Sequence, residues 1–105
     1  MRVKVVNNAE QDRYELVDGS KALGFITYRR HPDLVVLTHT EIDPEFEGRG
    51  FGGHLVRGAL DDIKAQNIKM MPVCPFVQQW VARHPQYAHL DYRHGQSSTE
   101  RASDQ

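Results

Sequence analysis

Residues 47–60, EGRGFGGHLVRGAL, decide the fold of this chain, because a cluster of glycines here meets the start of a helical pattern. Apolar side chains recur after the glycines at the spacing of one helix face: Phe51, Leu55, Val56, Ala59, Leu60 and Ile63. The charged residues Arg57, Asp61 and Lys64 fall on the other face. The pattern predicts an amphipathic helix of about four turns that lies on a sheet.

The residues on either side of this helix are typical of strands. Before it, four segments have strand character: 3–6, 13–16, 23–28 and 34–42. Turn signals at Asp18-Gly19 and at 31–33 separate the last three of them. After it, residues 68–74 read as a further strand, and 76–81 read as a shorter helix that stops before Pro85. The predicted order is three or four antiparallel strands, the long helix, one strand and the short helix, which is an α+β architecture.

Composition limits the class of protein. The 105 residues carry 13 Lys and Arg against 14 Asp and Glu, which gives a net charge of -1. Without a basic excess, we expect neither a nucleic-acid partner nor binding to an anionic membrane. A single Cys makes no internal disulfide, and no signal peptide or membrane span is evident, so we expect a cytoplasmic location. We expect one domain over 2–92 and a disordered tail over 93–105, where no large apolar residue occurs.

The glycine cluster has the properties of an anion-binding loop. No Ser, Thr, Asp or Asn stands at the helix start, so the first backbone N–H groups are free to bind a ligand. Such N–H groups at the positive end of a helix favour phosphate, and Arg49 adds a cation. The other interpretation is that the glycines only shape a tight turn. Neither Gly-Lys-Ser/Thr nor a leading βαβ unit is present, which excludes the nucleotide P-loop and disfavours a dinucleotide site.

Residues 42–60, IDPEFEGRGFGGHLVRGAL, resemble the acetyl-coenzyme A loop of the GNAT superfamily of N-acetyltransferases, with the pattern Arg/Gln-x-x-Gly-x-Gly/Ala. Gly50 and Gly52 match its two glycines, whereas Glu47 stands where Arg or Gln is usual. A carboxylate beside a pyrophosphate is unfavourable, so we expect Glu47 to point to solvent. The segment PVCPF (72–76), followed by His84-Pro-x-Tyr87, is similar to the second signature of a minimal single-domain YjdJ-like subgroup.

The resemblance implies a mostly antiparallel, twisted sheet with one splayed strand pair, covered by one long and one short helix. Acetyl-coenzyme A is the implied cosubstrate, and its pantetheine arm would enter the splay. Pro72 lacks an N–H and gives a physical reason for pairing to fail there, although a bulge without function is the alternative. By resemblance, the cofactor-binding residues are Ile42 and Asp43 for pantetheine, and Gly48, Arg49, Gly50, Phe51, Gly52 and Gly53 for the pyrophosphate.

Three residues are candidates for the chemistry. The resemblance puts Cys74 near the acetyl group, either as a covalent acetyl acceptor or as an acid toward the coenzyme A thiolate, and the alternative is an inert small apolar residue. On strand 34–42, period-two alternation places His39 and Glu41 on the face of Val35 and Leu37. Glu41 is the first candidate base and His39 the second, or its partner; each could instead be a solvated strand-end residue.

The leading hypothesis is an N-acetyltransferase that moves an acetyl group from acetyl-coenzyme A to a primary amine of a protein or small molecule, at an open and shallow acceptor site. A non-catalytic module that binds or senses coenzyme A esters is the alternative, and an interaction domain using Phe76 and Trp80 is a third.

We expect Phe76 and Trp80 in the core, because they share a face with Val77 and Val81. We expect His54 on the surface, and no metal site, because His84, His89 and His94 are spaced by five residues. The sequence predicts neither the acceptor nor the oligomeric state.

Overall fold

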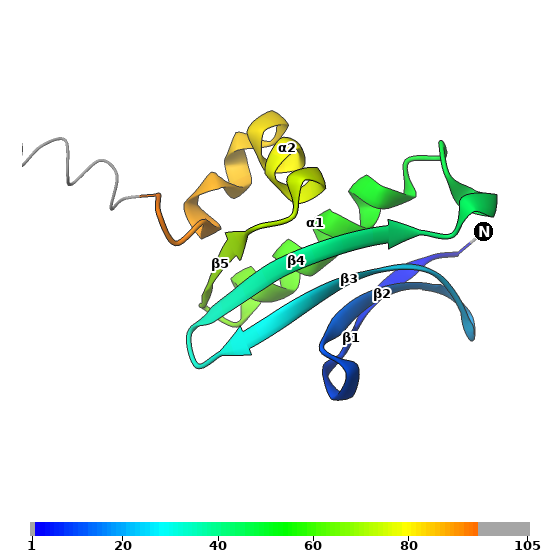
Figure 1. Cartoon of the computed structure of the whole chain (residues 1–105), viewed down its shortest axis with the longest axis horizontal. Helices are drawn as coiled ribbons and strands as arrows, with labels where there is room; N and C mark the ends of the chain where they lie inside the picture. The colour runs from blue at the N-terminus through cyan, green and yellow to red at the C-terminus, as the bar shows by residue number, and fades with distance from the viewer. Residues whose placement is uncertain (1, 95–105) are drawn as a thin grey trace, which may run out of the picture.

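Five strands form one sheet in the order β1-β2-β3-β4-β5 in the computed structural model, which describes residues 2–94 (Figure 1). The strands are β1 (Lys4–Asn8), β2 (Arg13–Asp18), β3 (Lys21–His31), β4 (Leu34–Ile42) and β5 (Lys69–Pro72). The helices are α1 (Phe51–Ala65) and α2 (Pro75–Arg83), with short 3-10 helices η1 (Ala9–Gln11), η2 (Pro44–Phe46) and η3 (Pro85–Leu90). The first four strands are antiparallel, and β5 is parallel to β4, so the predicted α+β fold is confirmed.

The helices lie on one side of the sheet. The apolar face of α1 packs across the strands, and Leu55, Val56 and Ile63 on it are fully buried. On the same side, the Trp80 ring of α2 packs against Gly53 of α1, and the hydroxyl of Tyr87 in η3 donates a hydrogen bond to Asp61 of α1. The opposite face of the sheet carries no helix from residues 2–94. Among these residues, no helix is long and apolar enough to cross a membrane.

Strands β4 and β5 separate from each other at Pro72. Their ladder runs from Leu34 opposite Lys69 to Leu37 opposite Pro72. β4 then continues for five residues that pair with β3 but have no partner strand on the β5 side. The N–H groups of Val73 and Cys74 both bond to the Leu37 carbonyl, each at 3.0 Å, and turn the chain away from β4 into α2. The predicted splay is confirmed, and β5 ends at Pro72 instead of reaching position 74. Figure 1 shows β4 running on past the end of β5.

A bulge in β4 changes which side chains face the helices. Tyr28 of β3 pairs with Leu37, but its neighbour Thr27 pairs with His39, so Thr38 is an extra residue in β4. A bulge of one residue reverses the alternation beyond it. Thr40 therefore lies on the helix side together with Leu37, three positions earlier. The expectation that His39 and Glu41 share the face of Leu37 is wrong.

The C-terminal end of the described chain lies beside β5. Asp91 forms a bridge to Met70, and the N–H of Tyr92 donates to the Met70 carbonyl at 2.9 Å. Of the tail expected over 93–105, Arg93 and His94 are described and continue a turn that closes with a bond from the His94 N–H to the Asp91 carbonyl. Residues 95–105 lie outside the described part of the chain.

Candidate active site

A cavity of about 360 Å³ opens between the end of β4, the glycine loop and the first turn of α2. It brings together residues that are far apart in sequence: Thr40, Ile42, Glu47, Gly48, Gly50, Phe51, Gly52, Gly53 and Phe76. Most of the residues expected to bind the cofactor are in this set. The cavity adjoins the part of β4 that has no partner strand on its β5 side.

Gly48 and Gly50 give the loop its shape. Their φ angles are +80° and +79°, a left-handed conformation that other residues adopt only with strain. Gly50 is the N-cap of α1, and no side chain caps this helix end. The backbone N–H groups at the first turn of α1, at the positive end of the helix dipole, therefore stand at the cavity without a side-chain acceptor. The expectation of an uncapped helix start is confirmed.

Gly52 and Gly53 have a different role from the glycines of the turn. A Cβ atom on Gly52 would lie 2.7 Å from the Phe76 ring, and one on Gly53 would lie 3.2 Å from Nε1 of Trp80. The two glycines thus let α2 approach the first turn of α1 closely. The interpretation that the glycines only shape a tight turn therefore applies to Gly48 and Gly50 at most.

Phe76 is not a core residue, contrary to expectation. Its side chain is 40% exposed and lines the cavity, whereas Val77 and Trp80 on the same helix are buried. Phe76 belongs to the first turn of α2, which faces the cavity before the helix passes over α1. The sequence pattern did not distinguish this turn from the rest of the apolar face.

The charges around the cavity differ from those expected. Glu47 is exposed to solvent, as predicted, but it also lines the cavity. Arg49 is not among the lining residues, and its guanidinium lies 5.6 Å from the centre of the Phe46 ring. The backbone groups of Asp43 already have partners, since its N–H bonds to the Leu23 carbonyl and its carbonyl accepts from Phe46. Neither Arg49 nor Asp43 lines the cavity, and Glu47 carries the only charged side chain among the lining residues.

Cys74 lies behind the wall of the cavity. It is the N-cap of α2, its side chain is 4% exposed, and its Sγ is 3.4 Å from the Oγ1 of Thr40. Thr40 lines the cavity, whereas Cys74 is not among the lining residues. Thr40 was absent from the predicted site, because only the bulge at Thr38 brings it to this side, and a bulge leaves no signal in the alternation of one sequence.

His39 and Glu41 lie on the opposite face of β4. Nε2 of His39 is 3.2 Å from Oε1 of Glu41, and both side chains are 60% exposed. The two residues form a solvent-facing pair on the face that no helix of residues 2–94 covers. Glu41 lines another hollow, next to Phe25, and not the cavity of the glycine loop. The two faces meet at the free edge of β4, which borders both.

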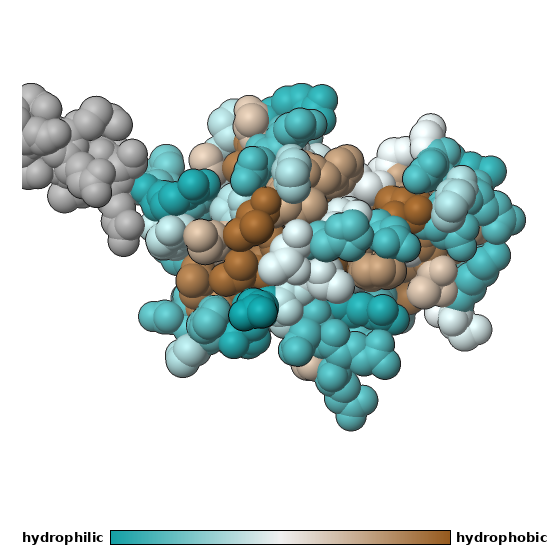
Figure 2. Space-filling view, viewed as in Figure 1, coloured by the Kyte–Doolittle hydropathy of each residue, from teal (hydrophilic) through white to brown (hydrophobic). Residues whose placement is uncertain are grey.

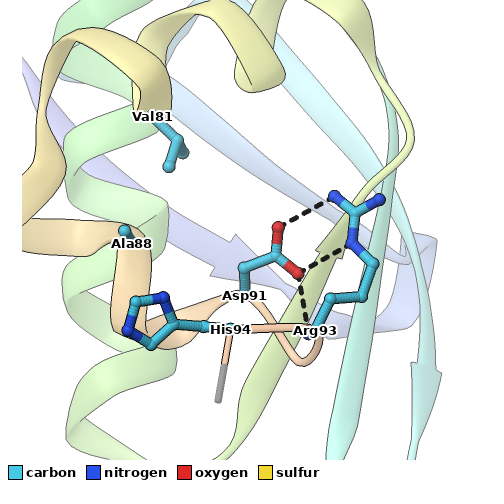
Figure 3. A pocket seen from close by; sticks show the side chains of 5 residues that line it. All are labelled: Val81, Ala88, Asp91, Arg93 and His94. Atoms are coloured by element: carbon cyan, nitrogen blue, oxygen red, sulfur yellow. Dashed lines mark hydrogen bonds and ion pairs between the residues drawn. The ribbon is translucent and has the colours of Figure 1, made fainter. Parts of the chain in front are cut away.

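A further hollow, of about 340 Å³, lies at the far end of α2 and contains none of the predicted site residues (Figure 3). Figure 3 shows the Arg93 side chain turned back on Asp91, whose Oδ2 lies 2.9 Å from Nη2 of Arg93. His84 does not point to a metal site, since its ring stacks on Trp80 with centroids 3.8 Å apart. Among residues 2–94, no group of three or more potential metal ligands comes together.

Comparisons with known proteins find a family and relatives that this sequence resembles. A family model for the GCN5-related N-acetyl-transferase matches residues 13–90. The chain is 32% identical to Protein NATD1 of Gallus gallus over 59 residues, 56% of this chain and 54% of that protein. It is 27% identical to Protein NATD1 of Danio rerio over 90 residues, 82% of each chain. The alignment thus spans about half the length of the chicken relative.

The fold has a counterpart among solved structures. A GCN5-like protein from Staphylococcus aureus, solved by NMR in solution, superimposes with a TM-score of 0.62 over 86% of each chain. At 22% sequence identity this similarity shows the fold alone. The narrower YjdJ-like assignment stays a prediction. Because the family model matches well over half of the sequence, the chain belongs to the GCN5-related N-acetyltransferase family, a family of acetyl-transferring enzymes.

Proposed function

We propose that this protein transfers an acetyl group from acetyl-coenzyme A to a primary amine. The observation that carries the proposal is the cavity in which the uncapped start of α1 meets the free edge of β4. The first offers N–H donors for a diphosphate, and the second offers backbone groups for an extended, amide-containing arm. Coenzyme A carries both groups on one molecule.

Beyond Pro72, β4 and β5 separate and leave a gap, here called the fork. Its dimensions suit the pantetheine arm. The part of β4 that has no partner on its β5 side runs from Thr38 to Ile42, a length of about 13 Å at the rise of an extended strand. An arm with two amide groups pairs with such an edge as a short added strand would. With the diphosphate at Gly50–Gly53, the thioester end then reaches toward the fork, where Thr40 and Cys74 lie.

The acceptor approaches from the other face of the sheet. Figure 2, in the view of Figure 1, shows apolar surface where β5 lies beside the first half of β4. Val36 pairs there with Met71, and Val73 is 47% exposed. No helix of residues 2–94 encloses this surface, so the acceptor site is open and shallow. It suits an exposed amine of a protein or a small molecule.

His39 and Glu41 then act as the base from this face. The amine nitrogen attacks the thioester carbonyl carbon, the C–N bond forms, and the C–S bond breaks as the coenzyme A thiolate leaves. Glu41 accepts the proton of the amine, with His39 holding the carboxylate in place. The products are an acetamide and free coenzyme A, whose thiolate takes a proton from Cys74 or from water.

Burial of Cys74 favours direct transfer over an acetyl-cysteine intermediate. Cys74 is 4% exposed and does not line the cavity, and its Sγ lies against the Thr40 hydroxyl, so the thiol is poorly placed to attack a carbonyl carbon there. A proton, in contrast, passes through the Thr40 hydroxyl without any movement of the sulfur atom. In this proposal Cys74 is an acid and Glu41 is the base.

The test is acetyl transfer to a panel of polyamines, amino acids and peptides, with product identified by mass spectrometry and coenzyme A binding measured by calorimetry. We expect an acetamide product, and Glu41→Gln lowers kcat by about 100-fold without changing the Kd of coenzyme A. Glu10→Gln, at an exposed carboxylate in η1, is the matched control and keeps kcat. Binding without transfer to any amine would instead indicate a non-catalytic module, and acetyl trapped on Cys74 would contradict direct transfer.

A further inference from the structure

A second cavity, of about 600 Å³, adjoins α1 on the side of β1. Its lining consists of Arg2, Val3, Lys4, Gly19 and His54, so three of five residues carry basic side chains and none carries a carboxylate. Arg2, Lys4 and His54 are all exposed. The hollow therefore has the composition of a site for an anion that remains partly in solvent.

The second cavity and the cavity of the glycine loop share the start of α1. Phe51, Gly52 and Gly53 line the first, and the next residue, His54, lines the second. Side chains on a helix tilt toward its N-terminus, so the His54 ring leans back toward the first turn. Figure 1 places the N-terminal residues at the same end of the molecule as the loop that precedes α1. An anion in the second cavity would thus lie close to a diphosphate bound at the first turn.

The first cavity leaves part of the charge of coenzyme A unmatched. It supplies N–H donors, but its only charged lining residue is Glu47, and Arg49 is turned onto Phe46. Besides its diphosphate, coenzyme A carries a third phosphate on the 3′ oxygen of its ribose, one sugar away from the diphosphate. This dianion needs cations, which the first cavity lacks and the second cavity provides.

We infer that Arg2, Lys4 and His54 bind the 3′-phosphate of coenzyme A, and that the protein thereby distinguishes coenzyme A from its 3′-dephospho form. The inference rests on the proposed function, since it requires the diphosphate to dock at α1. It assigns the adenosine end of the ligand to the β1 side of α1 and the pantetheine end to the β4 side. The subsite governs affinity for the cosubstrate and takes no part in the transfer step.

Calorimetry with coenzyme A and 3′-dephospho-coenzyme A tests the inference. We expect the wild-type protein to bind coenzyme A about tenfold more tightly, since exposed ion pairs contribute up to about 1 kcal/mol each. Arg2→Ala/Lys4→Ala loses most of the preference, so both Kd values lie near that of the dephospho form for the wild type. His54→Ala reduces the preference in part.

The matched control is Arg29→Ala/Arg83→Ala, which removes two exposed cations elsewhere and changes the net charge by the same amount. It keeps the tenfold preference, whereas a loss of preference in this control would mean that overall charge and not the subsite is responsible. Equal affinities for the two ligands in the wild type would overturn the inference and leave the proposed function intact. No binding of either ligand would overturn both. Circular dichroism melting confirms that each variant is folded.

Discussion

The hydroxyl of Thr40 lies 3.4 Å from the thiol of Cys74 and links β4 to the start of α2 across the fork between β4 and β5. Thr40 lines the cavity, whereas Cys74 is almost completely buried. A ligand in the cavity therefore meets the hydroxyl before the thiol. If Cys74 protonates the leaving thiolate, Thr40 is the group through which the proton passes.

Substitution of Thr40 separates this role from packing. Thr40→Val keeps the shape of the side chain and removes the hydroxyl, so we expect kcat to fall by about tenfold while the Kd of coenzyme A is unchanged. Thr40→Ser keeps the hydroxyl and retains most of the activity. Steady-state kinetics and calorimetry on the two variants measure these effects. Equal kcat values for the valine and serine variants would exclude a proton path through Thr40.

Replacement of Glu47 should strengthen coenzyme A binding. The carboxylate lines the cavity that we assign to the diphosphate, where it repels the ligand. We expect Glu47→Gln to lower the Kd of coenzyme A by a factor of about three to five, and the gain to shrink at high salt. Glu45→Gln is the control, because Glu45 is exposed nearby, 3.9 Å from Lys21, and does not line the cavity. Weaker binding by Glu47→Gln would place the diphosphate elsewhere.

Local signals explain how far the sequence predicted the fold and the site. The uncapped start of α1 and the end of pairing at Pro72 follow from single residues, a glycine without a polar side chain and a proline without an N–H. The face of β4 on which His39 and Glu41 lie could not be predicted in this way, because it depends on the extra residue Thr38 in the register of β3 and β4. Such a bulge is a property of two paired strands and not of either sequence alone.

The exposure of Phe76 could not be predicted from the sequence, for a related reason. Helical spacing puts Phe76 with Val77 and Trp80, but burial depends on where α2 crosses α1. That crossing is set by Gly53, against which Trp80 packs, and leaves the preceding turn over the cavity. The periodicity of a helix predicts a face, whereas its partner decides how much of that face is covered.

Gly58 on α1 is a position where a better helix former should destabilise the protein. A Cβ atom there would overlap with Cγ2 of Val5 on β1. Alanine stabilises a helix interior by about 1 kcal/mol relative to glycine, but the steric overlap costs more. We expect Gly58→Ala to lower the free energy of unfolding by about 1 to 2 kcal/mol, as measured by urea denaturation.

The second variant in this test removes the obstacle. Gly58→Ala/Val5→Ala gives the new methyl group the space of the valine, so the double variant should be more stable than the sum of the two single changes predicts. The coupling free energy is expected to be about 1 kcal/mol or more. Additive effects within error would show that β1 and α1 do not approach each other as closely as described.

The ion pair of Asp91 and Arg93 makes stability depend on pH at the acid end (Figure 3). Burial alone would raise the pKa of the Asp91 carboxyl, but hydrogen bonds from the side chain and backbone N–H of Arg93 outweigh it and hold that pKa below its ordinary value of 3.8. The unfolded chain then binds more protons than the folded chain in this range, so stability falls as the pH falls through the folded pKa.

Asp91→Asn should therefore lower the free energy of unfolding at neutral pH and flatten its dependence on pH below about 4. We expect a loss of about 1 kcal/mol at most, because the Arg93 side chain is 55% exposed and solvent screens the pair. Urea denaturation at about pH 7 and at several values below about pH 4 measures both effects.

Arg93→Ala should give a similar curve, since it removes the side-chain donors that lower the pKa of Asp91. Arg83→Ala, at an exposed arginine of α2, is the control. If wild type and Asp91→Asn lose stability in parallel as the pH falls, the acid sensitivity arises from other carboxylates and the pair has no role in it.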